Sequence, residues 1–325
     1  MKIFFPFLLI IFIVSSNQLN EGKLKEPEAP NWMSFIPDDK KLIFINIPGA
    51  HDTAANLMHP LGESMARTQN KTIPELLRLG VRKLDIRVAP RELLEGDDQD
   101  WDLSTYHGMF ECYYIDEYNI TRNLTFKQIL LDIKNFLQEN PTETVIVWTQ
   151  SEKGDTYNNL KRACELFDKY TGDIFVKYNK NLKLGEVRGK IVSTTYMEGS
   201  SYHYGMDGGT GLEEIHRKFI DDYYNVWEVT GELKVEEVLD FMRTYDITIK
   251  EAEDEYENNN SKYPFYYSTA CTGEHQSILP FPKKQAEIVN PFLYDYEFKR
   301  FNYYGWIEMD YVNFKLAKRI IDTNL

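Results

Sequence analysis

Short runs of β-branched and aromatic residues recur along the chain beyond residue 40, and segments with helical spacing separate most of them. Eight runs are predicted strands: Leu42–Ile47, Lys83–Val88, Trp101–Tyr106, Thr144–Thr149, Lys190–Thr195, Lys218–Asp222, Pro264–Thr269 and Trp306–Val312. Strands that alternate with helices pack as a mostly parallel sheet covered by those helices. This pattern therefore constrains the chain to an α/β fold.

The helical segments support the same fold. The clearest predicted helix is Phe126–Glu139, which has one apolar face and begins at a capping box of Thr125 and Gln128. A second helix is predicted over Lys234–Tyr245, whereas the acidic stretch Glu251–Lys262 is predicted to be a solvated loop or a helix end. No glycine-rich phosphate-binding sequence follows a strand, so a single domain with a TIM (β/α)8-type barrel is favoured over an open doubly wound sheet.

The first 16 residues have the layout of a signal peptide, with Lys2, an apolar run from Ile3 to Val14 and two serines. This run is too short to span a bilayer, and no later stretch approaches the roughly 20 apolar residues that a spanning helix needs. We therefore expect a signal peptide over residues 1–16, a lead-in segment over residues 17–40 and the barrel over residues 41–325. The mature chain is expected outside the cell or in a secretory or endolysosomal lumen.

The net charge and the glycosylation sequons indicate what the surface of the protein can bind or carry. The chain has 37 Lys and Arg against 51 Asp and Glu, a formal charge of −14, which becomes −15 when Lys2 is removed. Such a surface repels a phosphate backbone, so no nucleic acid partner is expected, and no obligate protein partner is evident. Four Asn-X-Ser/Thr sequons are expected glycan acceptors: Asn70, Asn119, Asn123 and Asn259.

Polar side chains stand at the ends of three predicted strands. His51 and Asp52 follow the first strand, Asp85 and Arg87 alternate onto one face of the second, and His107 follows the third. Strand ends carry the catalytic residues of TIM barrels. Other interpretations stay open: the His-Asp pair could cap a helix, Asp85 and Arg87 could form a structural ion pair, and His107 could be a hydrogen-bonded core residue.

Together, His51, Arg87 and His107 are suited to phosphodiester cleavage. This reaction needs a base to activate the attacking hydroxyl, an acid to protonate the leaving alkoxide, and positive charge for the non-bridging oxygens. Two imidazoles and one guanidinium supply these three functions.

Six segments carry a resemblance to a known family: Ile47 to Asp52, Leu79 to Val88, Tyr106 to Gly108, Leu184 to Val192, Asp222 to Tyr224 and Met309 to Val312. With these motifs in order over residues 41 to 323, the chain resembles the bacterial-type phosphatidylinositol-specific phospholipase C X-domain family. The resemblance implies a distorted, incompletely closed TIM barrel.

The resemblance also implies the roles of five residues. His51 would take the proton from the inositol 2-hydroxyl, with Asp310 holding its imidazole in orientation. His107 would protonate the departing diacylglycerol, with Asp52 as a carboxylate partner that raises the population of imidazolium. Arg87 would bind the phosphate oxygens, in the place where calcium-dependent relatives use a metal ion. No metal or other cofactor is then expected.

Three further residues match inositol-binding positions of the family: Arg188, Asp222 and Tyr224. Asp85 is counted with these substrate-binding residues because it is expected in the same polar cluster. One departure concerns Gln150, which stands where many relatives have a lysine that contacts the inositol. Two outcomes stay open, because either Lys153 takes over that contact or the head-group preference differs.

The expected reaction is attack of the inositol 2-hydroxyl on phosphorus in phosphatidylinositol or its glycosylated form, which gives diacylglycerol and inositol 1,2-cyclic phosphate. The expected partner is a membrane surface that contains this lipid and is contacted transiently. Two alternatives stay open. One is a glycerophosphodiesterase or sphingomyelinase-D-like barrel, which would need carboxylates around a divalent cation. The other is a catalytically silent secreted barrel that binds lipid or glycan.

Overall fold

The computed structural model describes residues 28–90, 102–195, 231–244, 246–259, 266–269 and 281–325. The predicted signal peptide, residues 1–16, and the predicted strand over residues 218–222 lie outside the described residues. The strands are β1 (Ile47–Ala50), β2 (Lys83–Pro90), β3 (Leu103–His107), β4 (Phe110–Glu111), β5 (Tyr113–Ile115), β6 (Thr121–Asn123), β7 (Val145–Ser151), β8 (Phe175–Lys177), β9 (Ile191–Thr195), β10 (Tyr266–Ser268) and β11 (Trp306–Met309). The helices are α1 (Pro60–Met65), α2 (Ile73–Leu79), α3 (Phe126–Glu139), α4 (Thr156–Thr171), α5 (Leu184–Val187), α8 (Gly231–Thr244), α9 (Ile249–Asn259), α10 (Pro282–Asp295) and α11 (Phe314–Ile321).

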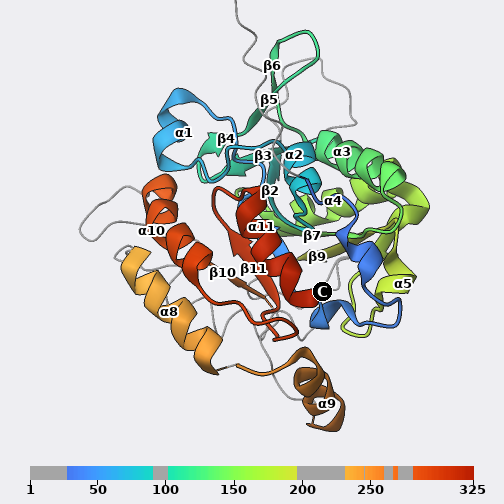
Figure 1. Cartoon of the computed structure of the whole chain (residues 1–325). Coiled ribbons are helices and arrows are strands. Elements are labelled where there is room, and N and C mark those ends of the chain that lie inside the picture. Colours follow the sequence, from blue (N-terminus) through green and yellow to red (C-terminus); the bar gives the residue numbers. More distant parts are fainter. Residues whose placement is uncertain (1–27, 91–101, 196–230, 245, 260–265, 270–280) are drawn as a thin grey trace, which may run out of the picture.

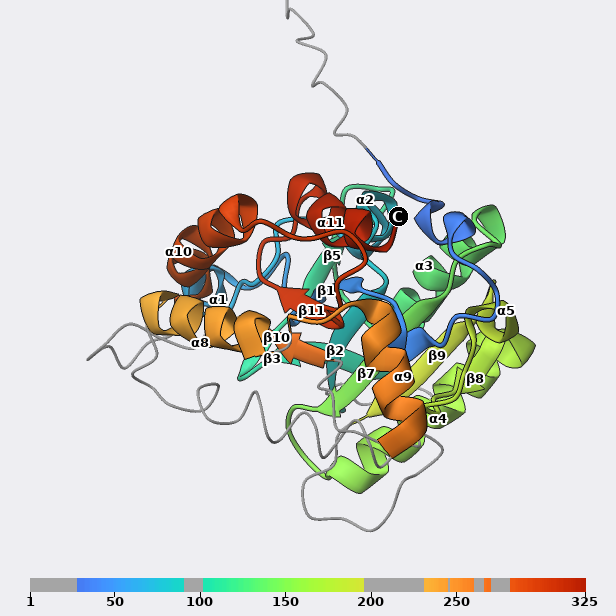
Figure 2. The ribbon, with the colours of Figure 1, turned by 60° about the horizontal axis from the view of Figure 1, so that its bottom comes forward.

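One parallel sheet organises these elements. Its main path runs β10, β11, β1, β2, β7, β9, β8, and helices lie along its outside (Figures 1 and 2). Among the described residues, β8 and β10 are the two ends of this path. The parallel order directs the C-terminal ends of β1, β2, β7 and β11 toward one side of the molecule, and β2 ends there beside the hairpin that carries β3 and β4.

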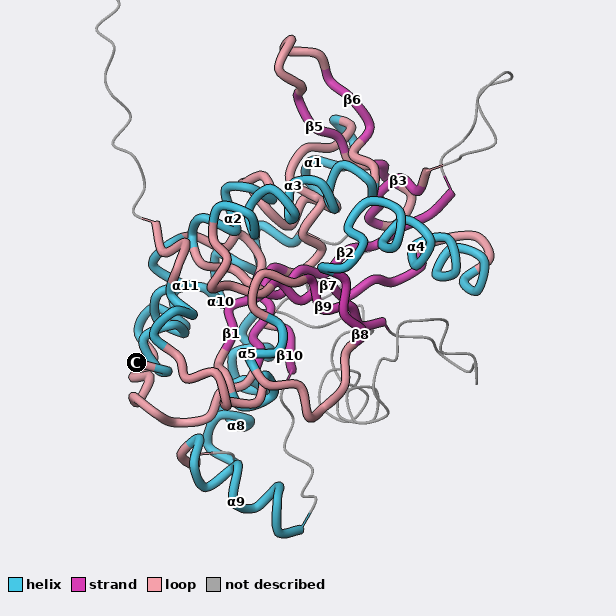
Figure 3. Tube along the Cα trace, turned by 90° about the vertical axis from the view of Figure 1, so that its right-hand side faces the viewer, coloured by secondary structure: helices cyan, strands magenta, loops and turns pink. Residues whose placement is uncertain are grey.

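The third predicted strand differs in direction from its neighbours. β3 pairs antiparallel with β2, Val88 opposite Thr105 and Pro90 opposite Leu103, and β4 then pairs antiparallel with β3. β3 therefore departs from a regular (β/α)8 barrel, in which it would run parallel to β2, because the chain reverses after β2 instead of crossing over the sheet. A second hairpin, β5 and β6, projects away from the rest of the fold (Figures 1 and 3).

Most other predicted strands are confirmed, with ends shifted by a few residues: β2, β7, β9, β10 and β11 occupy the predicted positions. The first prediction is wrong over most of its length, because Leu42–Phe44 is a short 3-10 helix and the strand begins at Ile47. Residues 42–45 are all buried, and an apolar run that is buried on every side has no period that separates helix from strand.

The helix over Phe126–Glu139 is confirmed with the predicted bounds. The Thr125 side chain accepts a hydrogen bond from the backbone N–H of Gln128, while the Gln128 side chain donates to Asp132 instead of closing the capping box. The segment predicted as a loop or helix end is helix α9, which begins at a capping box between Thr248 and Glu251. None of the described helices is long and apolar enough to cross a membrane.

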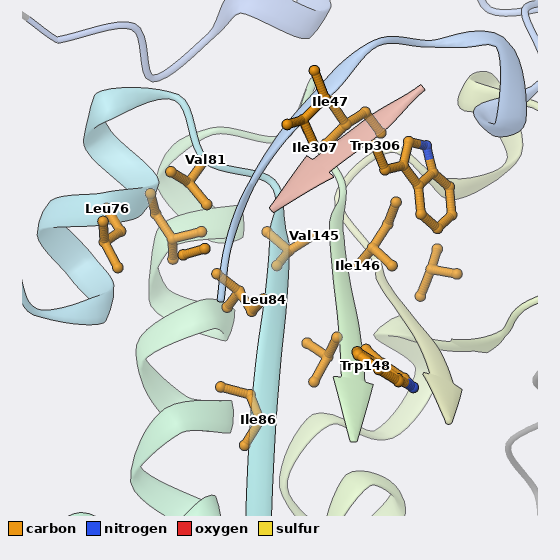
Figure 4. Packing of buried hydrophobic residues seen from close by; sticks show 14 of the residues in the cluster. Ile47, Leu76, Val81, Leu84, Ile86, Val145, Ile146, Trp148, Trp306 and Ile307 are labelled. Atoms are coloured by element: carbon orange, nitrogen blue, oxygen red, sulfur yellow. The ribbon is translucent and has the colours of Figure 1, made fainter. Parts of the chain in front are cut away.

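The core lies between the sheet and the helices. Leu84 and Ile86 point from β2 toward the helices, on the same side as Leu76 and Val81 (Figure 4). Because successive side chains of a strand point to opposite faces, the intervening residues Lys83, Asp85 and Arg87 point to the other face of the sheet. The core packing of β2 thus fixes the direction of three charged side chains.

Part of the predicted lead-in segment packs against the start of the strands. Trp32 and Met33 are buried, and the Trp32 indole donates to the carbonyl of Gly80 over 2.9 Å. The guanidinium of Arg82, which precedes β2, donates to the carbonyl of Pro30 and forms a fully buried ion pair with Glu143 at 2.9 Å. These contacts lie at the N-terminal ends of the strands, on the far side from His51.

Candidate active site

The end of β1 meets the end of β11 at a His-Asp pair. Ala50 is paired with Met309, so the next residues along each strand, His51 and Asp310, lie side by side. Nδ1 of His51 is 2.8 Å from Oδ1 of Asp310, and both side chains are buried. The predicted orientation of His51 by Asp310 is thus present in the geometry.

Arg87 contacts the other ring nitrogen of His51. Nη2 of Arg87 lies 2.9 Å from Nε2 of His51. A guanidinium can only donate, so Nε2 accepts this hydrogen bond and the proton of the neutral imidazole is on Nδ1, where it is donated to Asp310. The network therefore assigns His51 as a neutral imidazole whose Nε2 lone pair is held by Arg87.

Three carboxylates surround the same guanidinium. Its nitrogens lie 3.3 Å from Oδ2 of Asp52, 3.4 Å from Oδ2 of Asp85 and 3.8 Å from Oε2 of Glu152. Oδ2 of Asp85 also accepts the backbone N–H of Asp52 at 3.0 Å, which links β2 to the residue after His51. The predicted shared face of Asp85 and Arg87 is confirmed, and both side chains belong to the same cluster as His51.

His107 reaches this cluster from the β3–β4 hairpin. Its Nδ1 lies 2.6 Å from the carbonyl oxygen of Ala66 and 3.2 Å from Oδ2 of Asp52, so this nitrogen carries a proton and donates it. The ring centres of His51 and His107 are 6.3 Å apart and the rings are nearly perpendicular, at 85°. Asp52 contacts both His107 and Arg87, so the two imidazoles and the guanidinium form one site, which we call the His-Arg-His cluster (His51, Arg87 and His107).

Burial shifts the pKa values of this cluster. Burial and the nearby charge of Arg87 lower the pKa of His107 below its ordinary value, while Glu152 and the Ala66 carbonyl oppose the shift. Burial raises the pKa of the Asp52 carboxyl well above its ordinary value, although Arg87 opposes this. In the free site, desolvation and the guanidinium therefore outweigh the groups that favour the imidazolium of His107. The role of Asp52 in raising the imidazolium population stays a prediction.

Asp85 is shifted in the opposite direction. Burial disfavours its ionised form, but the charges of Arg87 and Lys83 outweigh burial and lower its pKa to about 2. Asp85 is therefore the fixed negative charge of the cluster at neutral pH.

The remaining predicted site residues have different positions. Asp222 and Tyr224 lie outside the described residues. Lys153 is exposed at the end of β7, with its ammonium 3.7 Å from the centre of the Tyr106 ring, so it stands beside β3 near the cluster.

The structure does not support the predicted substrate-binding role of Arg188. It precedes β9 and therefore lies at the N-terminal end of the strands, where its guanidinium donates to Asp38 over 2.6 Å. It also donates to the carbonyls of Met33, Ile36 and Thr142. The structure does not bring Arg188 to the His-Arg-His cluster, and its donors bind the lead-in segment and the carbonyl of Thr142 before β7.

Two features of the site were missed in the sequence. Oε1 of Glu152 accepts the backbone N–H of Gly108 at 2.6 Å, which ties the turn after His107 to β7. Two residues before Asp85, on the same face of β2, the ammonium of Lys83 forms an ion pair with Glu308, and both side chains are only 1% exposed. The position of Glu152 just after a strand and the alternation of Lys83 with Asp85 were the available signals.

Within the described ranges, no group of three or more His, Cys, Asp or Glu side chains is arranged to hold a metal ion. The positive charge at the centre of the described site is the guanidinium of Arg87, which contacts His51 directly. A bound phosphate group could replace the contacts of Arg87 with its carboxylates, since phosphate accepts bidentate hydrogen bonds from arginine.

Comparison with known proteins identifies relatives. No protein-family model matches the chain. The 1-phosphatidylinositol phosphodiesterase of Staphylococcus aureus is 29% identical over 217 residues, which are 63% of this chain and 60% of the relative. The protein of the same name from Listeria monocytogenes is 28% identical over 197 residues, which are 58% of this chain and 56% of the relative. The matched region thus spans less than two thirds of these relatives.

Solved structures extend the likeness to nearly the whole chain. The phosphatidylinositol-specific phospholipase C from Listeria monocytogenes superposes with a TM-score of 0.64 at 21% identity, over 92% of this chain and 99% of that one. A structure of the Staphylococcus aureus enzyme, from work on its membrane binding, gives a TM-score of 0.63 at 22% identity, over 92% and 98% of the two chains. The predicted distorted TIM barrel is confirmed, and so is the resemblance to bacterial phosphatidylinositol-specific phospholipases C.

Proposed function

We propose that this chain is a metal-independent phospholipase C that cleaves phosphatidylinositol, or its glycosylated form, into diacylglycerol and inositol 1,2-cyclic phosphate. The observation that carries the proposal is the contact between Arg87 and His51: the cation that would bind phosphate is 2.9 Å from the base that would activate the attacking hydroxyl. The names of the relatives and the shared fold support the same substrate.

The base step follows from the tautomer of His51. When a phosphodiester binds, its oxygens take the hydrogen bonds of Arg87, which releases Nε2 of His51 to accept the proton of the inositol 2-hydroxyl. The 2-oxygen then bonds to phosphorus. The imidazolium that forms keeps its Nδ1–H on Asp310, 2.8 Å away, and the carboxylate stabilises the new charge.

The acid step follows from His107. The bond between phosphorus and the glycerol oxygen breaks, and His107 gives that oxygen a proton. Because the charge of Arg87 lowers the pKa of His107 in the free site, an anionic phosphate beside Arg87 offsets this effect and favours the imidazolium. Substrate binding therefore prepares the acid, while Asp52 and the Ala66 carbonyl hold its Nδ1.

We also propose which residues hold the inositol ring, two of them matched through the family. Asp222 and Tyr224 are the proposed inositol contacts from outside the described residues. Lys153 is a third, because its ammonium stands on Tyr106 next to the hairpin that carries His107. Asp85 acts indirectly, through its contacts with Arg87 and the backbone of Asp52.

The lipid surface is proposed to meet an apolar rim, which we define as Leu61, Met109, Ile115 and Tyr118. These side chains are between 56% and 77% exposed, and they belong to α1, the β3–β4 turn and the β5–β6 hairpin. A Cβ atom at Gly62 would lie 2.9 Å from the Phe110 ring, so α1 and β4 are in close contact. Apolar side chains that enter the lipid interface would compensate for the weak electrostatic attraction of an acidic protein to membranes.

The chain is further proposed to enter the secretory route after removal of residues 1–16. Two of the sequons suit this route, because Asn70 and Asn119 are exposed. Asn123 is less accessible, since its side-chain amide donates to Glu111 over 2.7 Å.

The test is to incubate the protein with phosphatidylinositol vesicles in excess chelator and to follow the water-soluble phosphorus product by 31P NMR. The expected product is inositol 1,2-cyclic phosphate. Activity that requires an added divalent cation would indicate the glycerophosphodiesterase-like alternative, and absence of turnover would indicate the catalytically silent barrel.

Three variants complete the test. His51→Ala and His107→Ala should each lower turnover by about 10²- to 10⁴-fold without loss of the folded state, because each removes one proton transfer. Arg87→Asp with added calcium should recover little activity, because the neighbouring carboxylates Asp52 and Asp85 would lose their cation. Near-normal rates in either histidine variant would refute the assignment of roles.

A further inference from the structure

The segment Thr68–Gln69 lies beside the His51–Asp310 pair, and the hydrogen bonds of its side chains join backbone groups of the two strands that carry the pair. Both residues are fully buried. Their hydrogen bonds reach the backbone at the end of β1 and at the end of β11, the two strands that present His51 and Asp310. We infer that Thr68 and Gln69 are positioning residues that hold the His51–Asp310 pair in register, a role that rests on the proposed function of the pair.

The Gln69 side chain joins the two strand ends with every polar group it has. Its Nε2 donates to the carbonyl of His51 over 2.8 Å and to the carbonyl of Met309 over 3.0 Å. Its Oε1 accepts the backbone N–H of Val312 at 3.2 Å. A primary amide has two N–H donors and one carbonyl, so the side chain is fully used and clamps the backbone on both sides of Asp310.

Thr68 completes the clamp at the two residues that follow the catalytic pair. Its hydroxyl donates to the carbonyl of Asp52 over 2.9 Å, and its own carbonyl accepts the backbone N–H of Tyr311 at 2.7 Å. The Tyr311 hydroxyl also donates to the carbonyl of Arg67, 2.8 Å away. The contacts of Thr68 and Gln69 are therefore symmetric about the pair, one set at the end of β1 and one at the end of β11.

The backbone at these points is strained. Asp52 has φ 41° and Tyr311 has φ 49°, the left-handed region that residues other than glycine rarely occupy. Such conformations persist only where the surroundings fix them, and they gather at functional sites. Because the Thr68 hydroxyl bonds to the strained Asp52, its loss would let this residue relax and would move the preceding His51 away from Asp310, while the backbone bond to Tyr311 remains.

A small displacement is sufficient to matter for catalysis. Nδ1 of His51 and Oδ1 of Asp310 are 2.8 Å apart, and misplacement of a catalytic group by about 1 Å can cost about 10²-fold in rate. Loss of a residue that orients a metal-binding histidine typically costs about 10- to 100-fold, and we expect the same range for the orientation of His51. Neither residue contacts the substrate, so the loss should fall on kcat and leave KM nearly unchanged.

The test compares Gln69→Met, Thr68→Val and Thr68→Ser. Met removes the amide at similar volume, Val removes the hydroxyl at constant shape, and Ser retains it. We expect Gln69→Met and Thr68→Val to lower kcat for phosphatidylinositol by about 10- to 100-fold with KM within about threefold, and Thr68→Ser to retain most of the wild-type kcat. Should Gln69→Met fail to fold, the Val and Ser pair decides the matter.

A second readout does not depend on activity. In 15N-labelled protein the Nδ1–H of His51, identified by its disappearance in His51→Ala, should give a resolved proton signal because Asp310 holds it. This signal should weaken or exchange rapidly with water in Gln69→Met and Thr68→Val and remain in Thr68→Ser. A wild-type protein that shows the signal but does not cleave phosphatidylinositol would refute the proposed function alone. Unchanged kcat together with an unchanged signal in both disruptive variants would overturn the positioning role.

Discussion

Replacing Arg188 by alanine separates a structural role from a substrate-binding one. Its guanidinium donates to the backbone carbonyls of Met33, Ile36 and Thr142 at distances between 2.5 and 3.1 Å. A hydrogen bond from a charged donor contributes about 1.5 to 3 kcal/mol, but these carbonyls can bind water in the variant, so the three together should contribute about 3 kcal/mol. The ion pair with Asp38 adds little, because that carboxylate is 74% exposed.

We therefore expect Arg188→Ala to lower the free energy of unfolding by about 3 kcal/mol, measured as a lower urea midpoint at constant slope. In the folded variant, kcat and KM for phosphatidylinositol should stay within about twofold of wild type, because the residue lies at the opposite ends of the strands from His51. A KM raised several-fold with an unchanged urea midpoint would refute this reasoning and restore Arg188 to the substrate site.

The matched control is Lys190→Ala in the same loop. The side chain of Lys190 donates one exposed hydrogen bond, from its ammonium to the carbonyl of Glu186 over 2.8 Å. Its loss should cost less than about 1 kcal/mol and leave activity unchanged. An equal loss of stability in both variants would show that the loop, and not the contacts of Arg188, determines the effect.

Three further predictions address the site and its rim. Lys83→Met should destabilise the fold by about 3 to 5 kcal/mol because Glu308 is left buried without its cation, and the double variant with Glu308→Leu should recover most of this in urea unfolding; an equally unstable double variant would contradict it. Asp85 has a folded-state pKa of about 2, below its ordinary 3.8. Its ionisation therefore stabilises the fold by about 2 kcal/mol above pH 4, and this is lost as the pH falls toward 2, a dependence that should disappear in Asp85→Asn. In a glycosylating host, Asn119→Gln should remove one glycan by mass and strengthen binding to vesicles, since a glycan there would hold Tyr118 out of the lipid; unchanged binding would remove the hairpin from the rim.

Local signals made part of this structure predictable from the sequence. The helix over Phe126–Glu139 has a continuous apolar face and a threonine cap, and both signals lie within one segment of 15 residues. The alternation along β2 placed Asp85 and Arg87 on one face because the period of a strand is two. The positions of His51 and Arg87 in one site followed from adjacent strands whose ends lie together.

The errors had signals that depend on topology. The connection between β2 and β3 has 12 residues, about the minimum for a parallel crossover, which usually also contains a helix, and no helix was predicted there, so a reversal of the chain was an available alternative. Arg188 stands before a strand, and residues before the strands of a parallel sheet lie at the end away from the catalytic loops. The error at Arg188 came from transferring a motif without asking on which end of the sheet it falls.

Other features had no sequence signal of their own. Gln69 bonds to the carbonyl of Met309, 240 residues away, and Lys83 pairs with Glu308 across the sheet. A buried glutamine or lysine is unusual for its type, but its burial becomes visible only when the strands are placed. These contacts are properties of the tertiary fold.

The proposed roles of His51 as the base and His107 as the acid are tested most directly with a leaving group that needs no acid. The substrate is an inositol phosphodiester with nitrophenol in place of diacylglycerol, compared with phosphatidylinositol. His107→Ala should lose about 10²- to 10⁴-fold on the lipid but stay within about tenfold of wild type on the nitrophenyl ester, whereas His51→Ala should be impaired on both. Equal losses on the two substrates in His107→Ala would contradict the assignment of His107 as the acid.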